Sequence, residues 1–573
     1  MYTFRLQAAG QALLDNLDVH LDYCPSFASV YTGESAPCYV HNGWDLCDVG
    51  WRFVEAVHLT RRALGQVCTD PREMKLRERV FATLREDGLS YRPGYAWDDG
   101  TAWMWDQGRA LIALCSLAEG GDEAERCLDA ARRMLETLDA IALRSPNGLP
   151  VYPFENWDGK QWGTEIIGHP PTGLQLEGAA RFYALTGEEK FLDYARRVAR
   201  QVVEQATPIL DRDGQFIQRG GGENLTLKYT HIHSRLAIFY GLYMVGKALG
   251  EPVFMDYARR GYETALGFSL SYGWVPECLE RLGPYRDGDA GEDERQANAL
   301  DEVCCLMDMI KWGLLLGSEG QADGYDLAER FAVNGVFAHQ LVESDRLADY
   351  VSTIPIPEHA PGQVDARDLP ARFFGMFNGA QHAHQFWRQY GSPYPIMVPS
   401  GCCSPAGTTA LALLSLDTLT ANGGGGERTG GAKSGGTLSV NAYIPVSRPH
   451  AHMMADPGTG RFTLTIAKSF ASLRLRQPTW AKGLPLHLTH RGKPVTQVTA
   501  NGKDVENGWI HIEQPPIGVL EGHFPTTERQ TTEPWCGGKL SAKWLGNKVM
   551  SIDTDHEIRN PLFPLLPVFQ RPL

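Results

Sequence analysis

Two short segments of the chain carry residue types whose spacing favours metal chemistry. One is Asp-Glu-Val-Cys-Cys at residues 301–305, and the other is Gly-Cys-Cys-Ser-Pro at residues 401–405. Together they offer one carboxylate and three thiols, a donor set that suits Zn²⁺ in tetrahedral geometry. The expected ligands are Glu302, Cys304, Cys402 and Cys403. We predict one tightly held zinc ion per chain.

The placement of the second cysteine pair favours thiolate over thiol. Cys402 and Cys403 precede a predicted helix over residues 408–419, and both a helix N-terminus and a metal lower the pKa of a thiol. The alternative is that these cysteines are small buried hydrophobic residues, as most free cysteines are. Two Cys-Cys pairs, one of them preceded by Glu302, favour the metal site over that alternative.

Composition limits the classes of function. The chain has 573 residues, of which 43% are hydrophobic and 21% charged, as expected for a globular protein of more than one domain. Its formal charge of −14 disfavours nucleic acid and anionic membranes as partners. Neither a transmembrane segment nor a secretory signal is visible, so we expect a cytoplasmic protein. The 12 dispersed cysteines are typical of free thiols in a reducing compartment.

The elements that must position these residues are mainly helices. Apolar residues recur every three or four positions through residues 8–420. A glycine followed by an acidic residue recurs at Gly121-Asp122, Gly187-Glu188 and Gly250-Glu251, each time before a new helix. Such a glycine ends one helix in the left-handed conformation, and the acidic residue begins the next. We predict that residues 1–421 form helical hairpins closed into an (α/α)6 barrel.

The pattern changes after a Gly-rich linker or loop at residues 422–436. Apolar and polar residues alternate from there, for example at Phe462, Leu464 and Ile466, which is typical of strands. We predict a β-sandwich over residues 437–527, whereas residues 528–573 show no clear pattern and form a C-terminal extension. The expected fold class is thus mainly α, an (α/α)6 barrel followed by a C-terminal β-sandwich.

The residues around the cysteines resemble glycoside hydrolase family 127, the β-L-arabinofuranosidases. That family combines an (α/α)6 barrel with β-sandwich domains, and it holds zinc with a Glu-x-Cys segment and a later Cys-Cys pair. Glu302-Val303-Cys304 and Cys402-Cys403 match these motifs, and the similarity extends from about residue 45 to residue 527. The resemblance implies a retaining exo-glycoside hydrolase acting on an oligosaccharide or glycoside. It also implies that Cys402 is the nucleophile.

The resemblance implies further site residues. Glu292 best matches the family's general acid, and Glu294 and Glu277 are close alternatives. The implied substrate-binding residues are Asp48, Arg109, His169, Glu177 and His231.

Arg109 departs from the family pattern, because it stands where the family has a histidine. A guanidinium is always charged and binds carboxylates in bidentate fashion. We therefore predict a preference for an acidic or branched sugar over plain β-L-arabinofuranose. The alternative is that Arg109 pairs with a neighbouring acid, for which Asp106 on the same helix is a candidate, and contacts no ligand.

Two other classes of function stay open. One is an (α/α)6 uronyl hydrolase or polysaccharide lyase acting on an acidic sugar, and the other is a carbohydrate-binding protein without catalysis. Metal content and reaction products distinguish them, because a lyase releases an unsaturated sugar. The sequence leaves the sugar, the linkage and the oligomeric state, monomer or homodimer, undecided.

Overall fold

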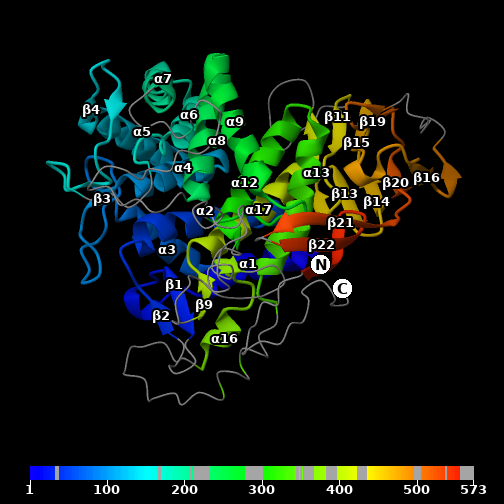
Figure 1. The fold of residues 1–573 in the computed structure, drawn as a ribbon, viewed down its shortest axis with the longest axis horizontal. Coiled ribbons are helices and arrows are strands. Elements are labelled where there is room, and N and C mark those ends of the chain that lie inside the picture. The colour runs from blue at the N-terminus through cyan, green and yellow to red at the C-terminus, as the bar shows by residue number, and fades with distance from the viewer. Residues whose placement is uncertain are drawn as a thin grey trace.

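The computed structural model separates into a helical half and a β half. It describes residues 1–31, 38–164, 170–204, 210, 231–277, 301–342, 348, 352, 367–381, 396–422, 435–495, 505–535 and 538–554. In Figure 1 the helices run from blue to yellow-green, and most of the strands, yellow to red, lie at the other side. The predicted fold class is confirmed: an (α/α)6 barrel is followed by a C-terminal β domain. None of the described helices is long and apolar enough to cross a membrane.

Six described helices form the inner ring of the barrel. They are α2 (Trp51–Leu64), α4 (Met104–Glu119), α6 (Leu176–Thr186), α8 (Ile232–Leu249), α12 (Val303–Ser318) and α17 (Cys403–Thr418). Each contacts the next along the chain, and α17 returns to contact α2, which closes the ring. Helices such as α12 are buried on almost every face, because apolar residues cover their whole circumference.

Six outer helices pack against this ring within the described part of the chain. They are α1 (Tyr2–Asp15), α3 (Pro71–Phe81), α5 (Ala124–Ile141), α7 (Glu189–Glu204), α9 (Pro252–Phe268) and α13 (Ala322–Phe331). These helices are amphipathic, and each contacts an inner neighbour. Gly187 and Gly250 end α6 and α8 with φ of 71° and 68°, so the predicted left-handed caps are confirmed there.

The β domain contains two packed sheets. One has the order β10-β11-β15-β19-β18, and the other has the order β12-β13-β14-β20-β16-β17. The strands of the first sheet are β10 (Leu419–Asn422), β11 (Thr437–Val440), β15 (Ser472–Arg476), β18 (Val505–Glu506) and β19 (Trp509–Glu513). Those of the second are β12 (Val446–Arg448), β13 (Ala451–Asp456), β14 (Arg461–Ile466), β16 (His487–His490), β17 (Lys493–Pro494) and β20 (Gly518–His523). Phe462, Leu464 and Ile466 on β14 are buried, as their alternation predicts.

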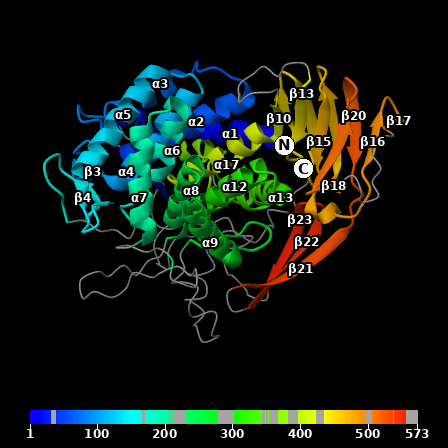
Figure 2. The same cartoon turned by 90° about the horizontal axis from the view of Figure 1, so that it is seen from above.

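Residues 528–554, for which the sequence shows no clear pattern, form a third sheet. Strands β21 (Glu528–Trp535), β22 (Gly538–Leu545) and β23 (Lys548–Thr554) pair antiparallel in that order. Figure 2 shows them beside the sandwich, on the side of α9 and α13. Glu533 on β21 accepts hydrogen bonds from Ser271, and Asn547 donates one to Glu329 on α13. The sheet thus packs against the barrel through polar contacts.

Buried ion pairs join the barrel to the sandwich. Arg476 on β15 is fully buried and pairs with both Asp326 and Glu329 of α13. Burial opposes ionisation of Asp326, but Arg476 and Arg330 outweigh it and lower the pKa of that carboxyl to about 2. The charges at this junction are therefore balanced by residues of the chain itself.

Short elements connect the inner helices near the two cysteine-containing segments. Strand β7 (Asp301–Glu302) pairs with β8 (Ala380–Gln381) just before α12, and β9 (Ile396–Ser400) pairs with β1 (Ala28–Tyr31) just before α17. Strand β2 (Cys38–Val40) pairs with β1, and the π-helical turn η2 (Asp45–Gly50) leads into α2. The other short described elements are η1 (Val19–Leu21), β3 (Ala102–Trp103), β4 (Leu143–Arg144), β5 (Pro150–Val151), β6 (Asn156–Trp157), η3 (Ala332–Val336), α14 (Phe337–His339), α16 (Leu369–Arg372) and η4 (Thr479–Ala481).

Candidate active site

The four predicted ligands lie at the N-termini of two neighbouring inner helices. Glu302 ends β7 and is the N-cap residue of α12, and Cys304 follows in the first turn. Cys402 is the N-cap residue of α17, and Cys403 is its first residue. Helix α17 thus begins five residues earlier than the predicted start at residue 408. Both helix N-termini place partial positive charge at the sulfurs, which favours thiolate.

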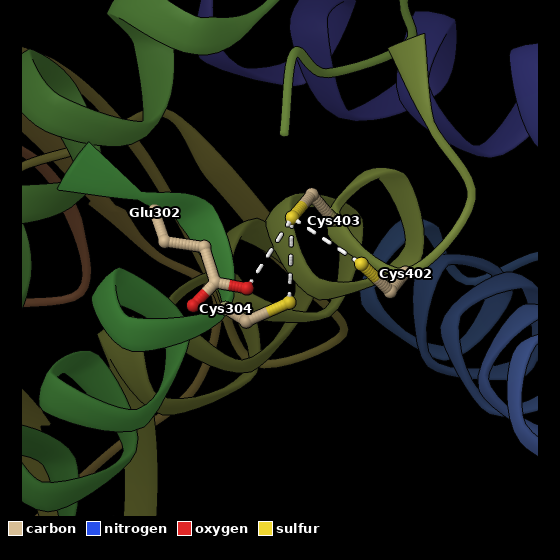
Figure 3. A group of neighbouring side chains, drawn as sticks. All are labelled: Glu302, Cys304, Cys402 and Cys403. Carbon is tan, nitrogen blue, oxygen red and sulfur yellow. Dashed lines mark hydrogen bonds between the residues drawn. The ribbon is translucent and has the colours of Figure 1, made fainter. Parts of the chain in front are cut away.

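The donor atoms of these residues converge on one point (Figure 3). The Sγ of Cys403 lies 3.5 Å from that of Cys304, 3.6 Å from that of Cys402 and 3.8 Å from Oε1 of Glu302. All four donor atoms lie within 4.8 Å of one another. Two thiolates bound tetrahedrally to zinc at about 2.3 Å would be separated by about 3.8 Å. The residues present therefore fit a tetrahedral zinc ion.

The electrostatics of the cluster also favour a cation. Burial raises the pKa of the Cys304 and Cys403 thiols well above the usual value, so protein groups alone do not supply thiolates here. A divalent cation reverses that balance, because a coordinating thiol loses its proton. Cys304, Cys305, Cys402 and Cys403 are free of disulfides.

His231 holds the carboxylate of the cluster. This residue is the N-cap of α8, and its Nε2 lies 2.9 Å from Oε2 of Glu302. The thiol of Cys305 donates to the same oxygen at 3.2 Å, which leaves Oε1 facing Cys403. Such outer contacts orient a ligating carboxylate. The predicted substrate-binding residue His231 is therefore placed directly beside the predicted metal ligand Glu302.

An arginine from α2 contacts the cluster on another side. Nε of Arg52 donates to Oδ1 of Asp48 at 2.6 Å, and its Nη1 lies 3.7 Å from Sγ of Cys304. The same Nη1 lies 3.4 Å from Nε2 of His233. Asp48, a predicted substrate-binding residue, is buried and bound to Arg52. It therefore positions the cation that lies next to the sulfur atoms.

The guanidinium of Arg109 also contacts His233, as that of Arg52 does. Its Nη2 donates to Nε2 of His233 at 2.7 Å, and its guanidinium stacks over Trp105 at 4.4 Å from the ring centroid. Asp106, the suggested acidic partner of Arg109, bonds instead to Arg92 at 3.1 Å. Among the residues that the structure describes, no ion pair joins Arg109 to a carboxylate. Arg109 thus remains a buried cation whose direct partners are an imidazole and an indole.

The protonation of His233 follows from its partners. An arginine can only donate, so Nε2 is an acceptor and the proton sits on Nδ1, which donates to Oδ2 of Asp308 at 2.5 Å. Burial, together with Arg109 and Arg52, lowers the pKa of His233 well below its usual value. A neutral imidazole therefore connects the two arginines to Asp308.

Glu177 lies in the barrel, and neighbouring cationic side chains compensate the negative charge of its carboxylate. Both of its oxygens lie 2.7 Å from Nζ of Lys311, and Arg181 is 3.7 Å away. The structure therefore links this predicted substrate-binding residue to α12 through an ion pair.

Of the three candidates for the general acid, Glu277 lies within the described residues. Its side chain is buried, its backbone oxygen accepts a hydrogen bond from Ile232, and its charge contributes to raising the pKa of His231. The remaining candidates, Glu292 and Glu294, and the predicted substrate-binding residue His169 lie outside the described residues.

The sequence reasoning did not single out Arg52, His233 or Asp308 as site residues. A signal was present for two of them, because residues four apart share a helix face. Arg52 follows Asp48 by four positions, and Asp308 follows Cys304 by four. His233 carries no such signal, since its partners come from three other inner helices.

Comparison with known proteins supports the fold. No family model matches the sequence, and no curated protein matches it. Among solved structures, a β-arabinofuranosidase of glycoside hydrolase family 127 is 14% identical with a TM-score of 0.57, over 96% of this chain and 79% of that chain. A β-L-arabinofuranosidase of that family from Geobacillus stearothermophilus is 15% identical with a TM-score of 0.53, over 94% and 80%. A third structure, described as a glycoside hydrolase, is 15% identical with a TM-score of 0.53, over 87% and 76%. The predicted resemblance to glycoside hydrolase family 127 is thus confirmed at the level of the fold.

Proposed function

We propose that the chain is a zinc-dependent retaining exo-glycoside hydrolase with a cysteine nucleophile. The observation that carries this proposal is the convergence of three thiols and one carboxylate at the N-termini of α12 and α17. The similarity in fold to two β-arabinofuranosidases supports the class of reaction. The proposed metal ligands are Glu302, Cys304, Cys402 and Cys403.

Cys402 is the proposed nucleophile, because it is the half-exposed member of the cluster whereas Cys304 and Cys403 are buried. Its Sγ attacks the anomeric carbon as the bond from that carbon to the leaving oxygen breaks. Zinc bound by these residues would keep the sulfur deprotonated for attack and stabilise it as it leaves. Water then attacks the anomeric carbon, and Sγ departs as thiolate.

A carboxyl group must give a proton to the leaving oxygen and then take one from the attacking water. Glu292 is the proposed acid/base, with Glu294 and Glu277 as alternatives. Glu277 is supported by its burial beside the contact between His231 and Glu302. Comparing the pH profiles of Glu277→Gln and Glu292→Gln separates the candidates, because loss of the true acid/base removes one limb of the profile. An activated leaving group such as nitrophenol should rescue only the first step of that variant.

Arg109 supports an acidic or branched sugar as substrate, in preference to plain β-L-arabinofuranose. The neighbouring Arg52 is already paired with Asp48, but the guanidinium of Arg109 contacts the neutral His233, which offers it no negative charge. A sugar carboxylate would supply it through bidentate hydrogen bonds. The same observation favours the second candidate function, an (α/α)6 uronyl hydrolase or lyase acting on an acidic sugar.

The experiment that tests the proposal is a panel of neutral and acidic nitrophenyl glycosides, assayed on protein whose zinc is quantified in the same sample. We expect one zinc ion at the cysteine cluster. We also expect release of nitrophenol, together with a sugar product that retains the anomeric configuration of the substrate. Less than half an equivalent of zinc at that cluster in fully active protein would overturn the zinc mechanism. An unsaturated product would identify a lyase, and binding without turnover would identify a carbohydrate-binding protein.

A further inference from the structure

A second group of metal-ligating side chains lies apart from the cysteine cluster, in the chain segments that precede α2. Cys24 follows η1, His41 follows β2, and Asp45 begins η2. One donor atom from each of the three lies within 4.8 Å of the other two. We propose that Cys24, His41 and Asp45 form a second zinc site. This inference goes beyond the proposed glycosidase activity and does not depend on it.

The imidazole of His41 is held as metal-binding histidines are held. Its Nδ1 lies 2.9 Å from Oδ2 of Asp45, and its Nε2 lies 3.2 Å from Oδ2 of Asp18. A ligating histidine almost always donates its other ring N–H to a carboxylate, which fixes the ring and its tautomer. In the proposed site Nδ1, which already lies beside Asp45, would bind the metal, and Asp18 would anchor Nε2. Asp18 itself accepts a hydrogen bond from the backbone of His20 at 2.9 Å.

The donor set and the burial indicate zinc. One sulfur, one imidazole nitrogen and one carboxylate oxygen are ligands that zinc accepts, whereas calcium and magnesium prefer oxygen alone. Cys24 is fully buried, and the side chains of His41 and Asp45 are 13% and 3% exposed. Nδ1 and Oδ2 would separate to about 3.3 Å around a zinc ion at about 2.0 Å from each. Three protein ligands leave a fourth position for water or another group.

A proton is the competing occupant of this site. Burial disfavours a charged imidazole, but the hydrogen bonds with Asp18 and Asp45 outweigh it and raise the pKa of His41 to about 11. Without metal, an imidazolium between two carboxylates would leave the Cys24 thiol protonated, because burial raises its pKa as well. Zinc replaces the proton on Nδ1 and takes the thiol as thiolate. Metal content therefore separates the two states directly.

The second site is connected to the cysteine cluster through the backbone. Oδ1 of Asp45 accepts a hydrogen bond from the backbone of Phe27 at 2.7 Å, and the oxygen of Phe27 accepts one from Gly401 at 2.5 Å. Gly401 directly precedes Cys402, and a Cβ there would lie 2.2 Å from the oxygen of Ser26, so the approach requires glycine. Zinc at Asp45 would thus fix the turn that presents Cys402.

The test is zinc quantification on full-length protein purified in reducing, zinc-supplemented buffer, with four variants. We expect two equivalents in the wild type and in the control Cys115→Ser, a buried thiol on α4. Cys24→Ala and Cys403→Ser should each retain one equivalent, and Cys24→Ala should lose no metal from the cysteine cluster. In Asp18→Asn the ligands stay, but zinc at this site should dissociate at a tenfold to hundredfold lower chelator concentration.

The outcomes distinguish this proposal from the proposed function. If Cys24→Ala and Asp18→Asn both hold as much zinc as the wild type, with unchanged resistance to chelator, the second site is wrong and a proton occupies it. If Cys24→Ala loses an equivalent whereas Cys403→Ser loses none, the second site stands and the zinc centre of the proposed function falls. Should Cys24→Ala not fold, the chelator titration of Asp18→Asn decides alone. Cobalt substitution gives a further readout, because a thiolate–cobalt absorption band should persist in Cys403→Ser at the intensity of a single thiolate ligand.

Discussion

Two buried polar clusters in this molecule differ in how their charge is balanced. At the junction of barrel and sandwich, Asp326 and Glu329 face Arg476, and every partner is supplied by the chain. At the cysteine cluster, Oε2 of Glu302 lies 2.9 Å from Nε2 of His231, and three thiols converge beside it. Although Arg52 lies 3.7 Å from the sulfur of Cys304, burial raises the pKa of Cys304 and Cys403, and a bound metal ion would favour their thiolates.

The difference favours a structural role for the junction and a metal-binding role for the cysteine cluster. Paired charges in a dry interior fix two elements relative to one another, and removing one partner is costly. Three converging thiols and a carboxylate instead form a group that could hold a metal ion, and the charge of that ion would govern its reactivity. Substitutions in one cluster can therefore be compared with substitutions in the other as a reference.

The largest expected effect is on turnover, from Cys402→Ser. A hydroxyl is far less acidic and less nucleophilic than a thiol held at a metal, so we expect kcat to fall by about a thousandfold or more. Thermal unfolding should change little, because Cys402 lies outside the junction of barrel and sandwich. The matched control is Cys115→Ser, which removes a buried thiol that donates to the backbone of Gly178. Activity above a few per cent of the wild type in Cys402→Ser would refute the nucleophile assignment.

The converse change, Asp326→Asn, should affect stability. It leaves Arg476 buried without its full countercharge, and breaking such a pair typically costs about 3–5 kcal/mol. Urea unfolding measures this loss, and zinc content should stay at the wild-type level. Asp323→Asn on the same helix is the matched control, because Asp323 is exposed and its change should stay within about 0.5 kcal/mol. Equal stability of the two variants would show that the junction contributes no net stabilisation.

The contrast between predicted and observed features has physical causes. Sequence spacing was enough to predict that the four donor residues lie together. Glu302 and Cys304 share one helix start, and Cys402 and Cys403 share another. The start of α17 was placed too late, although Pro405 is compatible with the earlier start at Cys403. A proline in the first turn costs nothing, because its missing N–H would be unpaired anyway.

Contacts between distant segments of the chain could not be predicted from the sequence. Arg52 and Arg109 meet His233 only because α2, α4 and α8 lie in one ring. The third sheet was missed for a different reason. Its central strand β22 does alternate, because Leu540, Ala542 and Trp544 are buried between more exposed residues, and this signal in the sequence was overlooked.

Acid should weaken the junction in a defined pH range. The folded-state pKa of Asp326 is about 2, below the usual value of 3.8 for an aspartate, because Arg476 and Arg330 outweigh the cost of its burial. Its stabilising contribution is therefore complete above about pH 4 and is lost as the pH falls toward 2. A shift of this size corresponds to about 2 kcal/mol. Unfolding free energies measured from pH 5 downward should fall more steeply in the wild type than in Asp326→Asn; parallel curves would contradict the assignment.

The smallest expected effect concerns the choice of substrate and follows from Arg109. This cation is buried against His233 and Trp105, so a sugar carboxylate would gain a charge-assisted partner that a neutral sugar cannot supply. Arg109→Ala should lower kcat/KM on acidic glycosides by about tenfold to a hundredfold, the value of one charged hydrogen-bonding partner, and change neutral glycosides much less.

Arg109→Lys is the matched variant, because it keeps the charge and loses the bidentate geometry, so it should fall between the wild type and alanine on acidic glycosides. Thermal unfolding separates this effect from a structural role, since loss of the contact with His233 alone would reduce stability and lower activity on both classes of glycoside. An equal fall on both classes, or a wild type that cleaves only neutral glycosides, would exclude the carboxylate as the partner of Arg109. The role of Arg109 would then be structural, to hold His233 and Trp105 in place.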